Sequence, residues 1–128
     1  MKHILIIKRN DQKWKGELVI IKHSLDPSKM TIETKQVYPK YGWDNLLTKL
    51  NNLQLFTLED SGSLPGYDGL GGADGISYDF EIATPTKYRI FMYGDLEGYE
   101  DKYSQVRTVL KITKLLEREF DFEISDKW

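Results

Sequence analysis

A glycine-rich loop over residues 59–75 and the strand after it hold the residue types best suited to chemistry. The loop contains six of the ten glycines of the chain. The aspartates in and just after it are Asp60, Asp68, Asp74 and Asp79. Carboxylate oxygens are ligands that Ca²⁺ prefers. However, the chain has no EF-hand pattern, and Gly71-Gly72-Ala73-Asp74 occurs as a single copy, without the neighbouring turn that completes a calcium β-roll. We therefore expect no metal ion here, with calcium in the loop as the alternative.

The same loop does not match the patterns that cradle phosphates. No lysine lies between Glu59 and Thr86, and the loop precedes an alternating strand and not a helix. Both points disagree with the P-loop and with the dinucleotide fingerprint. We interpret the loop as a surface segment whose glycines permit positive φ. The alternative is a lid over a small ligand or an enzyme active site, with Tyr67, Asp68 and Asp74 as its contact residues.

Other pairs of reactive side chains fit structural roles better than catalytic ones. His3 and His23 could face each other across the first hairpin, but no third metal ligand is near them in sequence. Asp79 and Glu81 could form an acid–base pair, but Arg89 is expected opposite Glu81. The chain has no cysteine and no Ser/His/Asp elbow, so covalent hydrolysis lacks a visible nucleophile. We expect a protein without enzymatic activity and without a cofactor.

An acidic and aromatic segment follows the second hairpin and suggests a protein partner. The candidate partner-binding residues are Tyr93, Asp95, Glu97, Tyr99, Glu100, Asp101 and Tyr103. Lys102 is the only basic residue beside these acids in sequence. Tyrosine is enriched at interface hot spots, and carboxylates attract basic surfaces over a distance. The segment therefore predicts a partner protein with a basic surface; core packing of the tyrosines is the alternative.

Composition excludes several classes of protein. The formal net charge is −2, with ten basic and five acidic residues in 1–50 (net +5) and eight against fifteen in 51–128 (net −7). A basic nucleic-acid binder is not indicated by this balance. The apolar run Ile4-Leu5-Ile6-Ile7 is too short for a signal peptide or a membrane span. The absence of cysteine fits a reducing compartment. We expect a cytoplasmic protein that binds neither nucleic acid nor membrane.

The periodicity predicts a single α+β domain over residues 1–128. Runs rich in β-branched residues predict strands at 2–9, 17–23, 30–38, 76–82 and 88–93, and apolar spacing of three and four predicts helices at 43–53 and from about 100–104 to 120. The expected order is β-β-β-α-β-β-α. Short connections favour a mostly antiparallel five-stranded sheet with two helices on one face.

Two hairpin registers and one buried helix face follow from this pattern. In the first hairpin the expected pairs are Arg9–Glu17, Ile6–Ile20 and His3–His23. In the second, a three-residue turn, Thr84-Pro85-Thr86, gives the pairs Ile82–Tyr88, Phe80–Ile90 and Glu81–Arg89. The expected buried face of the last helix comprises Val106, Val109, Leu110, Thr113, Leu116 and Phe120, widened by Ile112 and Leu115.

The pattern Asp74-Gly75-x-x-Tyr78-x-x-Glu81-Ile82, followed by an aromatic hairpin and a long amphipathic helix, resembles small uncharacterised bacterial α+β domains, some of them immunity-protein-like. The resemblance covers about residues 43–120 and implies a bacterial accessory or interaction protein. We expect a non-enzymatic protein-binding module, with an immunity or inhibitor role against a basic partner as the leading hypothesis. A homodimeric accessory protein is a further alternative.

Overall fold

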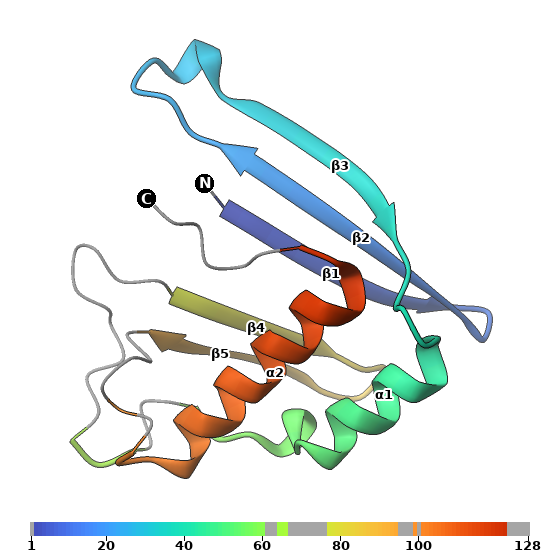
Figure 1. Cartoon of the computed structure of the whole chain (residues 1–128), viewed down its shortest axis with the longest axis vertical. Helices are drawn as coiled ribbons and strands as arrows, with labels where there is room; N and C mark the ends of the chain where they lie inside the picture. The colour runs from blue at the N-terminus through green and yellow to red at the C-terminus, as the bar shows by residue number, and fades with distance from the viewer. Residues whose placement is uncertain (1, 61–63, 67–76, 95–98, 100, 123–128) are drawn as a thin grey trace. The chain divides into compact units, whose positions relative to one another are not determined.

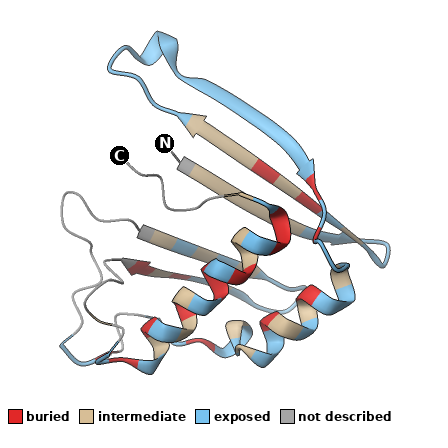
Figure 2. Cartoon of the chain, in the orientation of Figure 1, coloured by how far each residue is buried: buried red, intermediate tan, exposed pale blue. Residues whose placement is uncertain are grey.

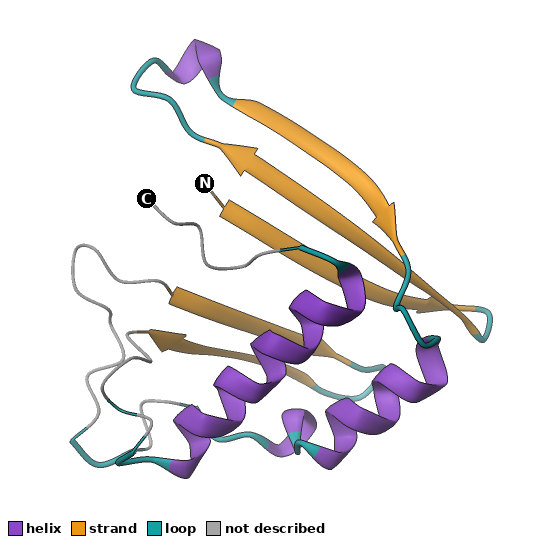
Figure 3. Cartoon of the chain, viewed as in Figure 1, coloured by secondary structure: helices purple, strands orange, loops and turns teal. Residues whose placement is uncertain are grey.

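The chain has an α+β fold, as the computed structural model of the protein shows (Figure 3). The structure describes residues 2–60, 64–66, 77–94, 99 and 101–122. The strands form two sheets, of three and two antiparallel strands, and not the single five-stranded sheet expected from the sequence. Periodicity shows which segments are strands but carries no information on which strands pair over long distances.

The order of the main elements agrees with the expected one. The strands and α-helices are β1 (Lys2–Asn10), β2 (Lys13–Lys22), β3 (Thr31–Val37), α1 (Trp43–Asn52), β4 (Ser77–Ala83), β5 (Tyr88–Gly94) and α2 (Ser104–Phe120). Two short 3₁₀ helices, η1 (Pro27–Lys29) and η2 (Leu55–Thr57), precede β3 and follow α1. The segment at 53–58, directly after α1, contains η2.

The chain divides into two compact units. The first comprises residues 1–47 and 116–128, and the second comprises residues 48–115. The expectation of a single domain over the whole chain stays a prediction.

In the first unit, β1, β2 and β3 lie side by side in sequence order (Figure 1). The β1–β2 hairpin turns over only two residues, Asp11 and Gln12, whose φ angles of 50° and 66° are left-handed. Left-handed φ at both central positions is typical of tight hairpin turns. The expected register was therefore wrong: Ile6 pairs with Glu17, and His3 pairs with Ile20 and not with His23.

One face of this sheet is covered by aromatic side chains. Leu18 is fully buried on it, and Val37 is 7% exposed. The Trp43 ring lies over Gly16, and it stacks on Trp14 with a centroid separation of 6.3 Å. Phe120 approaches Trp43 from the end of α2, at 5.9 Å. These rings form the core of the first unit.

A buried carboxylate holds the loop before α1. Glu119 is 4% exposed, and its Oε2 atom accepts a hydrogen bond of 3.3 Å from the backbone amide of Tyr41. The carbonyl oxygen of Glu119 accepts a second bond, of 2.9 Å, from the amide of Lys40. These contacts fix the entry to α1, where Trp43 must reach Gly16.

The β3 edge of the three-stranded sheet lies toward solvent. Every residue of β3 except Val37 is exposed, which Figure 2 shows as an almost continuous pale blue strand. β3 is the last strand in the order β1-β2-β3, so its outer edge pairs with no other strand in the part of the chain that the structure describes.

The second unit is built on the β4–β5 hairpin. Phe80 pairs with Phe91, Ile82 with Arg89, and Glu81 with Ile90. The expected register was wrong by one residue because the turn spans four residues and not three; the amide of Thr84 donates to the carbonyl of Lys87 at 2.8 Å. The buried core of this unit comprises Leu58, Leu64, Phe91, Tyr93, Tyr103, Val106 and Val109.

Helix α2 buries a face slightly rotated from the expected one. Val106, Val109 and Ile112 are fully buried, whereas Leu110 and Leu116 are only partly buried. The buried polar residues of α2 are Thr113 and Glu119. Leu110 and Leu116 therefore lie at the margin of the buried face, and Leu110 packs against the core of the second unit.

None of the helices that the structure describes combines the length and the apolar character that crossing a membrane would require.

Candidate functional site

The β4–β5 hairpin has one buried face and one exposed face. Cross-strand partners lie on the same face of an antiparallel pair, and successive residues alternate. The core-facing set comprises Phe91 and Tyr93, which are buried, and Tyr78, Phe80, Ile82 and Arg89, which are partly buried. The exposed set comprises Asp79, Glu81, Tyr88 and Ile90 and is called the hairpin face below.

The hairpin face combines two large apolar side chains with two carboxylates. Tyr88 is 60% exposed and Ile90 is 63% exposed, although both lie within a regular strand. Met92 continues this side of β5 and is partly buried. Exposed apolar side chains are common singly, but a contiguous group beside charged residues is a feature of interaction sites.

A hydrogen bond within the hairpin face links Tyr88 to Glu81. The Tyr88 hydroxyl donates to Oε1 of Glu81. This bond to the Glu81 carboxylate is the largest of the effects that raise the pKa of the Tyr88 phenol above its usual value, and the Glu81 charge adds to it. The bond holds the tyrosine ring at the solvent side of the sheet, which reduces the entropy lost when a partner packs on it.

Arg89 lies on the buried face and does not pair with Glu81 across the strands, contrary to expectation. Its Nη1 atom donates to the carbonyl of Phe56 at 2.8 Å, its Nη2 atom donates to the carbonyl of Leu58, and its guanidinium lies 5.0 Å from the Phe91 ring centroid. Arg89 thus connects β5 to η2. The one-residue change of register is what separates it from the acidic residues of the hairpin.

Two of the expected partner-binding tyrosines belong to the core. Tyr93 is fully buried, and its hydroxyl donates to the carbonyl of Glu59. Tyr103 is 8% exposed, and its hydroxyl donates to the carbonyl of Pro65. A partner cannot contact either ring while they remain buried, so the core-packing alternative describes these two residues correctly.

The other residues of the expected acidic and aromatic segment are only partly described. Asp101 is exposed, and Tyr99 is half-buried with its ring 6.1 Å from that of Tyr103. Asp95, Glu97 and Glu100 lie outside the described residues. The structure therefore leaves Asp101 as an accessible acid of this segment and brings no described acid together with an exposed tyrosine there.

The loop residues Tyr67, Asp68 and Asp74 also lie outside the described part of the chain. Within residues 2–60, 64–66, 77–94, 99 and 101–122, no group of three or more His, Asp or Glu side chains is arranged to hold a metal ion. His3 and His23 are not partners: the His3 ring lies 6.0 Å from that of Phe122, and His23 is exposed beyond the end of β2.

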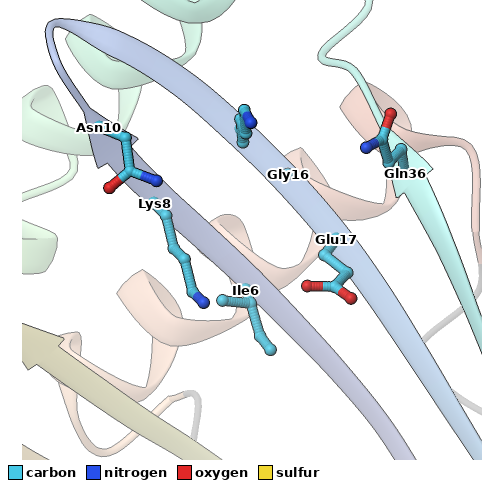
Figure 4. Close-up of a pocket in the computed structure, with 7 residues that line it drawn as sticks. Ile6, Lys8, Asn10, Gly16, Glu17 and Gln36 are labelled. Atoms are coloured by element: carbon cyan, nitrogen blue, oxygen red, sulfur yellow. The ribbon is translucent and has the colours of Figure 1, made fainter.

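A hollow of about 230 Å³ lies on the face of the three-stranded sheet opposite the one that Trp43 covers (Figure 4). It is lined by Ile6, Lys8, Asn10, Lys15, Gly16, Glu17 and Gln36. Lys8 and Lys15 are direct cross-strand partners, and Glu17 follows on β2. The lining offers charges of both signs, from Lys8, Lys15 and Glu17.

Sequence reasoning missed Tyr88 and Ile90 because both alternating sets of β5 contain large apolar residues. Tyr88, Ile90 and Met92 form one set, and Arg89, Phe91 and Tyr93 form the other. The turn length decides which set faces the core. The signal that could have identified the core-facing set is the hydrogen-bonding capacity of Thr84. Its Oγ1 atom accepts a hydrogen bond of 3.0 Å from the amide of Lys87, which closes a four-residue turn.

No protein-family model matches the chain, and no curated protein or solved structure matches it significantly.

Proposed function

We propose that this protein is a non-enzymatic binding module that contacts a basic partner protein through the hairpin face. The observation that carries the proposal is the exposure of Tyr88 and Ile90, 60% and 63%, on the same sheet face as Asp79 and Glu81. The leading role is that of an immunity or inhibitor protein, which covers a basic site on its target. The bacterial immunity-like domains that residues 43–120 resemble support this role.

Two physical arguments support the choice of partner. Carboxylates at an interface accelerate association with a basic surface and suppress acidic competitors. Tyrosine supplies a large contact area at a low cost in side-chain entropy and is enriched at hot spots. Ile90 lies across from Glu81 and adds apolar area that becomes buried on binding.

The proposal is tested by recovering the partner from the source cell and measuring its binding kinetics by surface plasmon resonance. Ile90→Ala should mainly speed dissociation, because it removes packed apolar area. Glu81→Lys should slow association and weaken the dependence of the association rate on salt, because it reverses a steering charge. Both sites are exposed, so thermal stability should change little.

Matched substitutions outside the hairpin face provide the controls. Leu25→Ala removes an exposed leucine from the loop between β2 and η1. Asp44→Lys reverses an exposed acid in the first turn of α1. Both should retain wild-type kinetics. A recovered partner that binds Ile90→Ala and Glu81→Lys as it binds the wild type at low salt would exclude this surface and the function built on it.

A further inference from the structure

The outer edge of β3 has the features of a strand that pairs with another strand. Residues 31–36 are all exposed, and the edge carries three of the exposed large apolar side chains of the protein. These are Met30 at 46%, Ile32 at 59% and Tyr38 at 70%. An open edge presents a row of unpaired amide and carbonyl groups to any strand of suitable sequence. Such an edge is a site of β-strand addition.

The extended edge is longer than β3 itself. Met30 has φ −64° and ψ 130°, an extended conformation, directly before Thr31. Tyr38 precedes Pro39, and a residue before proline favours the extended region. The extended edge therefore runs from Met30, whose own amide donates to the carbonyl of Pro27 at 3.3 Å, to Tyr38, with an exposed apolar side chain at each end.

We propose that this edge pairs antiparallel with the β3 edge of a second copy of the chain. In the fully overlapping register Thr34 lies opposite its own counterpart on the two-fold axis. Glu33 then lies opposite Lys35 of the second copy, and the symmetry repeats this pair on the other side of the axis. Opposite charges and Thr–Thr contacts across strands are both favourable. An interface of this kind is isologous, as in most homodimers.

The same register also matches the ends of the edge. Met30 lies opposite Tyr38 of the second copy, which places a thioether against an aromatic ring, a favourable contact. Ile32 lies opposite Gln36, whose Oε1 accepts a bond from Tyr38 at 3.2 Å. Both copies turn the same sheet face to the same side, because cross-strand partners share a face.

The edge charges disfavour the neighbouring registers. Along β3, the amide and carbonyl groups of every second residue point away from β2. The strand of a second copy can therefore shift along this edge only in steps of two residues. A shift of two residues in one direction places Glu33 opposite Glu33 of the second copy. The same shift in the other direction places Lys35 opposite Lys35 of the second copy. Like charges directly opposite are destabilising. Glu33 and Lys35 therefore select the full overlap, in which nine residues of each copy face one another.

Charge reversal tests the register directly. The probe is the full-length protein, and the readout is sedimentation velocity over a concentration series. The wild type should show a monomer–dimer equilibrium. Lys35→Glu converts both Glu33–Lys35 pairs into like-charge pairs and should raise the dimer dissociation constant at least about tenfold. Glu33→Lys should do the same, whereas Lys111→Glu, an equal reversal at an exposed site on α2, should not.

Combining the two reversals should restore association. The double variant Glu33→Lys/Lys35→Glu recovers opposite charges in the same register and should dimerise like the wild type. Fluorescently labelled Glu33→Lys mixed with unlabelled Lys35→Glu should form a heterodimer, although neither variant self-associates well. Circular dichroism melts of each variant show whether it is folded, so a folding defect is not mistaken for lost pairing.

A cysteine cross-link supplies an independent test of the two-fold axis. The chain has no cysteine, so Thr34→Cys can form a disulfide only with the same residue of another copy, and mild oxidation should link the dimer. Thr31→Cys, which faces Val37 of the second copy, should not cross-link. A wild type that stays monomeric at every concentration, a dimer insensitive to both single reversals, or equal cross-linking of Thr34→Cys and Thr31→Cys would overturn the proposal.

Discussion

Trp43 lies directly over Gly16, and the contact leaves no room for a side chain at position 16. A Cβ atom there would meet Cη2 of Trp43 at 2.9 Å and the carbonyl oxygen of Val37 at 2.8 Å. The glycine thus serves a close approach of backbone and ring inside a strand. Gly16 lies within β2 and not in a turn.

Gly16→Ala should destabilise the protein by about 1–3 kcal/mol, the usual cost of overpacking a tight site. The Val37 carbonyl belongs to the backbone and cannot move without disturbing the β2–β3 pairing. Thermal unfolding followed by circular dichroism measures the effect. Lys15→Ala, at an exposed neighbour in the same strand, is the control. Equal melting temperatures for the two variants would show that Trp43 does not approach Gly16 in solution.

Tyr93→Phe should lower the free energy of unfolding by about 1 kcal/mol, the typical contribution of a hydrogen bond, because the carbonyl of Glu59 loses its hydroxyl donor. Tyr88→Phe removes an equivalent hydroxyl from an exposed ring and should cost less. Chemical denaturation of both variants provides the comparison. If Tyr88→Phe were the more damaging change, the assignment of the buried and exposed faces of β5 would be inverted.

Ile112→Ala should destabilise more than Leu110→Ala, because Ile112 is fully buried and Leu110 only partly so. Truncation of a fully buried isoleucine costs about 2–5 kcal/mol. Lys111→Ala, between them on the exposed face, should be nearly neutral. The melting temperatures of the three variants establish the order. A Leu110→Ala variant with the lowest value would favour the helix face expected from the sequence.

Tyr88 should ionise at higher pH than an ordinary tyrosine. Its hydroxyl donates to Glu81, and deprotonation would place two negative charges side by side, so the pKa is raised. The resulting stabilisation is fully present below the unfolded-state pKa, about 10, and is lost as the pH rises through the higher folded-state value. Titration of the Tyr88 ring signals by NMR measures this pKa. Glu81→Gln should bring it closer to the ordinary value; an unchanged pKa would contradict the hydrogen bond.

The strands and helices of this fold can be predicted from periodicity, but the strand registers cannot. Asp11 and Gln12 lack the glycine that usually marks a two-residue turn, so the longer connection looked more plausible. The four-residue turn at 84–87 depends on hydrogen bonds of Thr84 that composition does not reveal. Each turn length then determines which residues oppose each other along the whole hairpin.

Which residues form the candidate site is determined by the strand register more than by the composition of the segments. An acidic and aromatic surface was expected from residues 93–103, but Tyr93 and Tyr103 are core residues. Exposed acidic and apolar residues instead coincide on the hairpin face, and this coincidence follows from the single-residue difference in pairing between β4 and β5. Alternation alone could not show it, since both sets of side chains in β5 are rich in large apolar groups.

The tight turn between β1 and β2 also bears on the order in which the protein folds. Its rungs join residues only 3 to 19 positions apart, from Asn10–Lys13 to Lys2–Ile21. Closing such short loops costs little entropy, and isolated hairpins form in about 1–10 μs. We expect this hairpin to form early and to offer β2 as a template on which β3 adds. The left-handed φ of Gln12 is less favourable for glutamine than for glycine and therefore slows the formation of this hairpin. Gln12→Gly should raise the folding rate constant more than it changes the unfolding rate constant.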